Sequence, residues 1–500
     1  MTFEPVPLTI AQLSQEHPQY VANSPAWRTI EALRSGYGAI KKNVGKYLPR
    51  RPVEDDELYE LRKAKLCYSP VMAHVVRTYA GKLVEAGIVF PETTNKVWLD
   101  LRGNSAAVGK PKRGELSLLS DIFRSLLYFG KAYTMVDLPK QVTQARSTFE
   151  LRQNGYKPYF TSISPLEVIN WGEGWYVLKQ YVQDSTPFTA NPLHCLFTYI
   201  GLDKTYRYSV PVKLEDVEDC EGNLVPQIAK VLYKNEWQKP DEFMTFDVTE
   251  IIAGVGSDRL VMTTVDDDEW LCYALYNKQI QHLRIENAWV DAGYLSGTVQ
   301  RVFTPSDPTV NDDPRVSYSD DSTRRDLAQA GNTHILIGKG YSFVESSGTA
   351  LANLEQMLDK IEQQIKVVAN LHFASSSKGT LQQSGLSKQM DMSLLTGIMH
   401  EYGLVVLDSY NALLAQVARI LSIDPVIVHG LSDYGTKDVD GTLATLTTIA
   451  PLVDFPAVAR HLLYRKLLDD SDIDLTSDED TVFIEQLATQ PTPTDTLIPE

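Results

Sequence analysis

Apolar residues recur at heptad spacing between residues 351 and 368, and this regularity limits the folds open to the chain more than any other feature. Such spacing places the apolar side chains on one face of a helix. A two-stranded coiled coil would explain the stripe, but packing inside a helical bundle or ring explains it equally and is commoner. Residues 347–373 are therefore predicted to form a long helix with one buried face. The stripe consists of Leu351, Leu354, Leu358, Ile361, Ile365 and Val368.

A second long helix is predicted immediately upstream, over residues 266–293. Three consecutive aspartates open it and suit the partial positive charge of a helix N-terminus. Its apolar stripe consists of Tyr273, Tyr276, Ile280 and Leu283. Between the two helices, residues 294–346 combine β-branched runs with a stretch rich in Pro and Asp, which is typical of strands and turns. A β insert of this size buries little surface alone, so we expect it to lean on neighbours.

The rest of the chain divides by its hydrophobic pattern. Residues 1–265 begin with helical periodicity and continue with short β-branched and aromatic runs, which favour an antiparallel sheet. Residues 374–385 form a small polar break, and residues 386–421 have the stripe of a very long helix. Residues 422–500 are predicted to contain short helices and an acidic tail. The expected fold class is α+β.

Size and composition narrow the class of protein. A chain of 500 residues is expected to form two or more domains. The four cysteines are far apart and lack C-x-x-C spacing, which argues against a disulfide framework or a zinc site and favours a reducing compartment. The amino terminus lacks a signal-peptide pattern, and no run of eighteen apolar residues occurs, so no membrane segment is expected.

The net charge of −17 bears on nucleic-acid binding. Phosphate binding depends on Lys and Arg replacing counterions, so an acidic chain is not expected to wrap DNA for affinity. Like charge on a channel wall would instead let DNA slide past. An acidic surface that only maintains solubility is the simpler alternative.

One basic stretch stands out within the acidic chain. It contains Lys41, Lys42, Lys46, Arg50 and Arg51. A solvated loop is one interpretation. Contact with a nucleic acid or an acidic neighbour is the other.

Motifs for catalysis are missing from the sequence. No Gly-Lys pair is followed by Ser or Thr, so the chain has no P-loop, and H-E-x-x-H, G-x-S-x-G and G-x-G-x-x-G motifs are also absent. His400-Glu401 has no second His four residues later, and no acidic cluster has the spacing of an EF-hand loop. We therefore expect no catalytic residue, no metal and no cofactor. A metal-dependent hydrolase that uses scattered acids remains a minor alternative.

The order of predicted elements resembles that of tailed-bacteriophage portal proteins, in particular a podovirus and siphovirus portal group. Residues 68–84 look like an early portal helix with a Gly-containing exit, and Pro165-Leu-Glu-Val-Ile-Asn-Trp resembles a short segment of that group. Ser384-Gly-Leu-Ser-Lys-Gln-Met-Asp looks like the entry to the helix after the portal channel loop. The likeness covers most of residues 20–421. The Pro-rich approach to the first stem helix is replaced by Thr263-Thr-Val-Asp-Asp-Asp-Glu-Trp, which leaves the start of that helix open.

The resemblance implies a domain plan. It comprises an amino-terminal wing (1–265), stem helix 1 (266–293), a clip (294–346), stem helix 2 (347–373), a channel loop (374–385), a long, kinked wing helix (386–421) and a helical crown with the tail (422–500).

The resemblance also implies an assembly. Portals of this kind are dodecameric rings at the capsid vertex, through which double-stranded DNA enters and leaves without sequence-specific contacts. The implied partners are the terminase large subunit, the head–tail adaptor, and the major capsid and scaffold proteins. The implied location is the virion, after assembly in the host cytoplasm, with no membrane involved.

Site residues follow from the same plan. The two apolar stripes described above would be stem-packing residues that contact adjacent subunits. The channel loop would project toward DNA through Ser375, Ser376, Ser377, Lys378 and Thr380. The clip would dock the terminase and then the adaptor through Arg301, Arg315, Arg324 and Arg325. Another ring-forming connector or tail component is the nearest alternative, although such proteins are usually shorter and lack two helices around a β insert.

Overall fold

The structure is a computed structural model with helices and sheets, and the predicted α+β class is confirmed. Two compact units divide the chain at Ser432 and Asp433. The structure describes residues 7–434 except 53, 94, 96, 100–113, 138–157, 184, 187–188, 191, 242, 254–255, 266–269, 298–299, 304–340, 345–347, 372–384 and 433. All the features below belong to the first unit.

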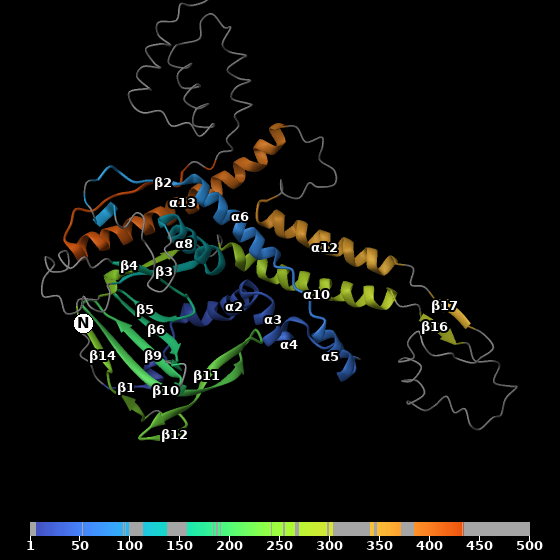
Figure 1. Ribbon diagram of the computed structural model, residues 1–500, viewed down its shortest axis with the longest axis horizontal. Helices are drawn as coiled ribbons and strands as arrows, with labels where there is room; N and C mark the ends of the chain where they lie inside the picture. Colours follow the sequence, from blue (N-terminus) through green and yellow to red (C-terminus); the bar gives the residue numbers. More distant parts are fainter. Residues whose placement is uncertain are drawn as a thin grey trace, which may run out of the picture. The chain divides into compact units, whose positions relative to one another are not determined.

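Helices dominate the amino-terminal part of this unit, as the sequence predicts (Figure 1). In α2, Trp27, Ile30 and Leu33 are fully buried at three-residue spacing, and the helix ends at Gly36, whose φ of 85° suits a residue without a side chain. The helices are α1 (Ile10–Leu13), α2 (Pro18–Ser35), α3 (Tyr37–Lys42), α4 (Val44–Tyr47), α5 (Asp56–Ala64), α6 (Val71–Ala86) and α8 (Glu115–Phe129).

Antiparallel sheets follow α8, at the position that the β-branched runs predict. A seven-stranded sheet has the order β12-β11-β10-β9-β6-β5, with β14 also paired to β10, and a three-stranded sheet has the order β15-β3-β4. The strands are β3 (Lys131–Asp137), β4 (Tyr159–Ile163), β5 (Val168–Gly172), β6 (Trp175–Val182), β9 (His194–Ile200), β10 (Lys204–Glu218), β11 (Leu224–Tyr233), β12 (Glu236–Gln238), β14 (Glu250–Ala253) and β15 (Leu260–Thr264).

One apolar core joins the two sheets. Tyr133 and Leu260 from the three-stranded sheet pack with Val168, Leu178 and Ile200 from the larger one. Burial of such side chains is the main force that holds sheets together. Helices of the unit pack against the three-stranded sheet beside this core.

A long helix, α13 (Gly385–Leu421), matches the predicted helix 386–421 almost residue for residue. Its inner face packs on α8, β3 and β15. The ring centroids of Phe123 and Tyr402 lie 5.4 Å apart in an edge-to-face contact, and those of Phe160 and Tyr410 lie 6.5 Å apart. The window Leu395–Leu421 is apolar and long enough to cross a membrane, but half of it is buried inside the protein. A core helix has this composition as well.

The predicted stem helices appear as α10 (Leu271–Gly297) and α12 (Thr349–Val368). The residues that open the predicted first helix, 266–269, lie outside the described residues. The prediction that this helix ends near Gly293 is wrong by about one turn. Gly293 lies inside α10, on the side that faces Leu351 of α12, where an added methyl group would make an ordinary contact with the Leu351 side chain.

Candidate functional site

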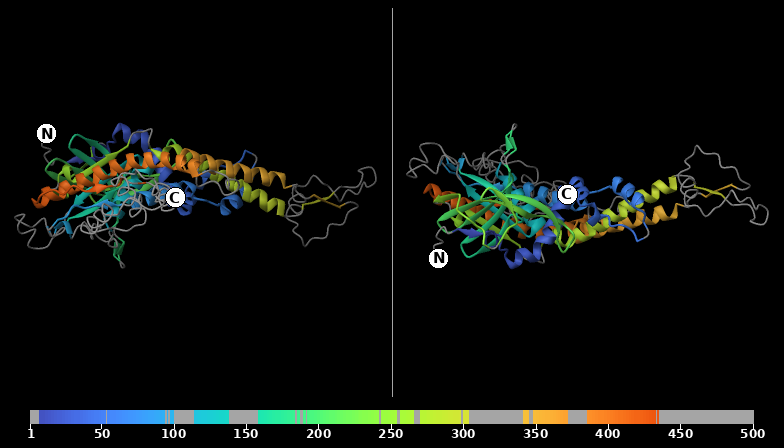
Figure 2. Two further views of the ribbon diagram at one scale, coloured as in Figure 1. Left: turned by 90° about the horizontal axis from the view of Figure 1, so that it is seen from above. Right: turned by 90° about the horizontal axis from the view of Figure 1, so that it is seen from below.

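The α10–α12 helix pair is the candidate functional feature of this chain. The two helices lie side by side and lead away from the sheets to the two-stranded ribbon of β16 (Gln300–Phe303) and β17 (Tyr341–Val344), as Figures 1 and 2 show. At 1.5 Å per residue, the 27 residues of α10 span about 40 Å. The predicted order of helix, β segment and helix is therefore present.

Polar contacts and close packing set the two helices antiparallel. Lys278 Nζ donates to Gln364 Oε1 at 3.1 Å, and His282 Nε2 lies 3.3 Å from Glu362 Oε1. Further along α10, Gly293 meets Leu351. Residue numbers rise along one helix as they fall along the other, which is the geometry of a helical hairpin.

Polar side chains on the buried face of α10 fasten it to the segment that opens α6. Gln279, fully buried, accepts from the Met72 amide at 2.8 Å and donates to the Ser69 carbonyl at 2.9 Å. Asn287 makes the same pair of bonds with the backbone of Cys67, both at 2.9 Å. Each amide satisfies a backbone donor and acceptor at once, so α10 has a fixed rotation about its own axis.

The predicted apolar stripe of α10 is only partly buried within one chain. Leu283 is fully buried and Tyr276 nearly so, Ile280 is half-buried, and Tyr273 is 50% exposed. Tyr273 stacks on Trp270 with ring centroids 4.7 Å apart. Its contact with a neighbouring subunit stays a prediction.

The predicted stripe of α12 follows the same pattern. Ile365 is fully buried, and Val368 is 38% exposed. The remaining members, which are half-buried, are Leu351, Leu354, Leu358 and Ile361.

Exposed apolar side chains remain along both helices. Trp289 on α10 is 40% exposed, and Met357 and Val367 on α12 are about half exposed. Met357 and Val368, the last member of the stripe, are eleven residues apart, close to three full turns, so they lie on the same side of α12.

The candidate residues for DNA and partner contacts lie almost wholly outside the described residues. Arg301 is on β16, where it pairs with Phe343 of β17. The structure does not describe the remaining candidate residues, which are Arg315, Arg324, Arg325, Ser375, Ser376, Ser377, Lys378 and Thr380. Their roles stay predictions.

The basic stretch at residues 41–51 is partly used inside the protein. Lys46 donates to Thr29 Oγ1 and to Asn223 Oδ1, both at 2.5 Å, and lies 3.7 Å from Glu221. Burial lowers the pKa of Lys46, and the acids beside it oppose that shift. Arg50 pairs with Asp56, and Arg51 with Asp291 of α10, while Lys41 and Lys42 are exposed.

Glu221 connects this network to the helix pair. Tyr276 of α10 donates to Glu221 Oε1 at 3.3 Å, and Arg284 donates to the carbonyls of Tyr47 and Lys46. The base of α10 is thus bonded to α4 and to the turn between β10 and β11. Single-sequence patterns do not reveal this network, because its members are separated by up to about 240 residues.

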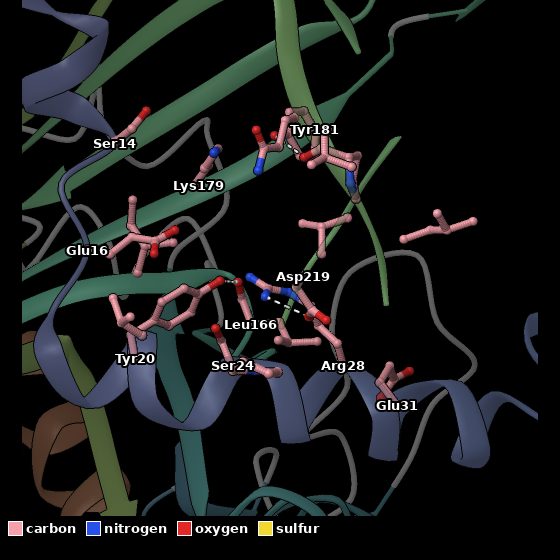
Figure 3. Close-up of a pocket in the computed structure, with 18 of the residues that line it drawn as sticks. Ser14, Glu16, Tyr20, Ser24, Arg28, Glu31, Leu166, Lys179, Tyr181 and Asp219 are labelled. Atoms are coloured by element: carbon pink, nitrogen blue, oxygen red, sulfur yellow. Dashed lines mark hydrogen bonds and ion pairs between the residues drawn. The ribbon is translucent and has the colours of Figure 1, made fainter. Parts of the chain in front are cut away.

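A groove of ≈ 730 Å³ lies between α2 and the strands β6 and β11 (Figure 3). Arg28 and Asp219 form an ion pair at 3.3 Å within it, and Tyr20 donates to the Leu166 carbonyl at 3.0 Å. Burial raises the pKa of Tyr20. These bonds hold α2 against the sheets. The sequence patterns do not predict them.

No group of three or more His, Cys, Asp or Glu side chains that could hold a metal occurs among the described residues. Cys195 and Cys272 are buried, and burial raises the pKa of both thiols, that of Cys195 to about 12. A thiol with a raised pKa is a poor nucleophile. These two cysteines are therefore packing residues.

No family model matches the chain, and no curated protein matches it. Among solved structures, one match is described as "Neck of empty GTA particle computed with C6 symmetry". It has 12% sequence identity and a TM-score of 0.38, and the alignment covers 83% of this chain and 96% of that chain. At this identity and TM-score, the similarity does not establish a shared function.

Proposed function

We propose that this chain is a structural subunit of a ring at the head–tail junction of a tailed-phage particle, and specifically its portal protein. The observation that supports the proposal is the antiparallel pair α10–α12, which is bonded to the segment that opens α6 at Gln279 and Asn287 and which leads to β16 and β17. The proposed role is structural, with no catalysis by this chain.

The exposed side chains of the pair supply the physical argument for a ring. Tyr273, Trp289, Met357 and Val367 would face water in an isolated chain, at an energetic cost that subunit contacts would remove. A contact between two different faces closes into a ring when its rotation divides a full turn. Twelve copies would then surround an opening wide enough for duplex DNA.

Passage rather than tight binding of DNA fits the charge of the chain. With a net charge of −17, the subunit has no excess of cations to hold a phosphate backbone. In the proposed assembly, the segment 294–346 docks the terminase large subunit and later the head–tail adaptor. Capsid and scaffold proteins surround the ring in the virion, which assembles in the host cytoplasm.

The mass of the purified assembly tests the proposal most directly. We expect native mass spectrometry to give about twelve times the 56.0 kDa of one chain, and electron images to show a ring with a central opening. A thin six-fold disc would assign the chain to another connector. A monomer at every concentration would refute both.

A charge placed in the exposed apolar face tests which surface makes the ring. Met357→Lys and Val368→Lys each place a charge at the proposed contact, where ring formation would bury it. Each variant is therefore expected to lower the proportion of rings strongly. The matched control is Gln356→Lys, because Gln356 is exposed and lies about 100° around the axis of α12 from Met357. Equal loss of rings in all three variants would refute the proposed contact face.

Contact between Lys378 and DNA phosphate is part of the proposal. It rests on the charge of Lys378 within the polar break at 374–385. Lys378→Ala is expected to reduce packaging or retention of DNA in particles that still form rings. Unchanged packaging would remove Lys378 from the proposed channel.

A further inference from the structure

A second cavity, of ≈ 600 Å³, lies among α2, α6, α8 and the end of β4. Each of the three helices contributes one arginine to its lining, namely Arg34, Arg77 and Arg124. The other polar side chains that line it are Glu31, Asp121, Ser125, Tyr128, Ser162 and Ser164. Three helices that are separate in sequence thus bring one guanidinium group each to one cavity.

Arg34 is held in place by packing and by an ion pair. Its guanidinium lies 5.2 Å from the ring centroid of Tyr128 and 5.8 Å from that of Phe129. It also pairs with Glu31 at 3.2 Å. The two rings and the carboxylate thus hold a guanidinium whose side chain is still 46% exposed.

Arg124 acts on the same tyrosine as Arg34. Burial raises the pKa of Tyr128 to about 12, and the positive charges of Arg34 and Arg124 oppose this rise. Both positive charges are therefore near enough to Tyr128 to influence its ionisation. Arg77, from α6, faces the cavity from the neighbouring helix and is exposed to solvent.

The cavity is locally cationic on an acidic chain. Its three arginines outnumber its two carboxylates, whereas the whole chain has a net charge of −17. Guanidinium groups donate in a planar fork that matches the oxygens of phosphate and carboxylate groups. A planar carboxylate is satisfied by one such fork. Donors that arrive from three helices and from serine hydroxyls suit the several oxygens of a tetrahedral group better.

We infer that this cavity is a binding site for a phosphate group, carried by a small phosphorylated molecule or by a nucleic-acid backbone. The cavity volume falls within the roughly 300–1,000 Å³ of small-molecule sites, which leaves room for more than one phosphate. The inference does not depend on ring formation, since all the lining residues belong to one chain.

Calorimetric titration of the full-length protein with sodium pyrophosphate tests the inference. We expect saturable binding that weakens at least ~10-fold in Arg77→Ala and in Arg124→Ala, as loss of a charge-assisted bond predicts. Arg124→Lys should recover only part of the affinity, because lysine keeps the charge and loses the fork. Lys230→Ala is the matched control, since Lys230 is exposed on β11 and does not line the cavity.

Two further ligands identify the source of the phosphate. Arginine-dependent binding of a 20-base-pair duplex more tightly than pyrophosphate would assign the site to a nucleic-acid backbone. Binding of pyrophosphate with no arginine-dependent duplex binding would assign it to a small molecule. Tighter binding of succinate than of pyrophosphate would overturn the inference, and so would the absence of pyrophosphate binding at millimolar concentration. Each variant must match the wild-type assembly state and thermal unfolding midpoint, so that ring failure and site failure are separate results.

Discussion

Nε2 of His282 on α10 lies 3.3 Å from Oε1 of Glu362 on α12. The His282 side chain is only 3% exposed, and its Nδ1 lies 3.8 Å from Glu286 of its own helix. One imidazole thus stands between carboxylates of both helices. The contact ties the two halves of the helical hairpin midway along α10.

Removal of this imidazole should loosen the hairpin. His282→Ala is expected to reduce the free energy of local opening of α10 and α12 by about 1–3 kcal/mol, because a buried polar contact is lost. Glu362→Ala should cost less, about 0.5–1 kcal/mol, since Glu362 is 40% exposed. Hydrogen exchange of the amides of both helices measures the change. Gln363→Ala, at an exposed neighbouring position, is the control and should leave protection unchanged.

Lys46 holds the base of the helix pair. Lys46→Met keeps the length of the side chain but removes the bonds to Thr29 and Asn223, and leaves Glu221 without its cation. We expect the free energy of unfolding, measured by thermal or urea unfolding, to fall by about 2–3 kcal/mol. Lys42→Met, on the exposed side of the same stretch, should have little effect. Equal stability of the two variants would contradict the role given to Lys46.

The ion pair between Glu54 and Arg62 gives the fold an acid-sensitive contact. Hydrogen bonds from Arg62 lower the pKa of Glu54 from 4.5 to about 2, with further help from the Arg51 amide. Between these two pH values, Glu54 therefore stays charged in the folded state but is protonated in the unfolded chain. The stabilisation is complete above pH 4.5 and is lost as the pH falls toward 2.

Unfolding measured between pH 5 and pH 2 tests this contact. Glu54→Gln should be less stable than wild type at pH 5, and the difference should shrink as the pH falls. Glu57→Gln, at an exposed position on α5, is the control. A constant difference between wild type and Glu54→Gln across this range would show that the ion pair does not control the acid response.

Asn287 satisfies the backbone of Cys67 on both sides. Asn287→Ala would leave a buried N–H and a buried C=O without partners, at a cost of about 2–3 kcal/mol. We expect faster hydrogen exchange in residues 66–72, where Gln279 binds the same segment. Gln281→Ala, on the exposed face of α10, should leave that segment protected. Slow exchange in the Asn287 variant would contradict the anchoring role.

Long periodic elements were predictable from the sequence because their periodicity needs no knowledge of partners. The helix predicted at 386–421 is α13, Gly385–Leu421, and α8, Glu115–Phe129, ends immediately before a glycine. Gly130 has φ of 68°, the left-handed conformation that ends helices. Local chemistry was enough at these positions.

Features that depend on distant contacts were not predictable. The buried face of α10 includes Gln279, His282 and Asn287, which a hydrophobic pattern assigns to solvent. Their partners are backbone groups near residue 70 or a carboxylate on α12. The arginine cavity is hidden for the same reason, because Arg34, Arg77 and Arg124 meet only in the folded chain.

Both legs of the helical hairpin are fastened to α6. Met72, in the first turn of α6, donates its amide to Gln279 of α10, and Tyr79, two turns later, donates its hydroxyl to the Ala369 carbonyl just after α12. A displacement of α6 therefore carries both legs together and does not slide one past the other.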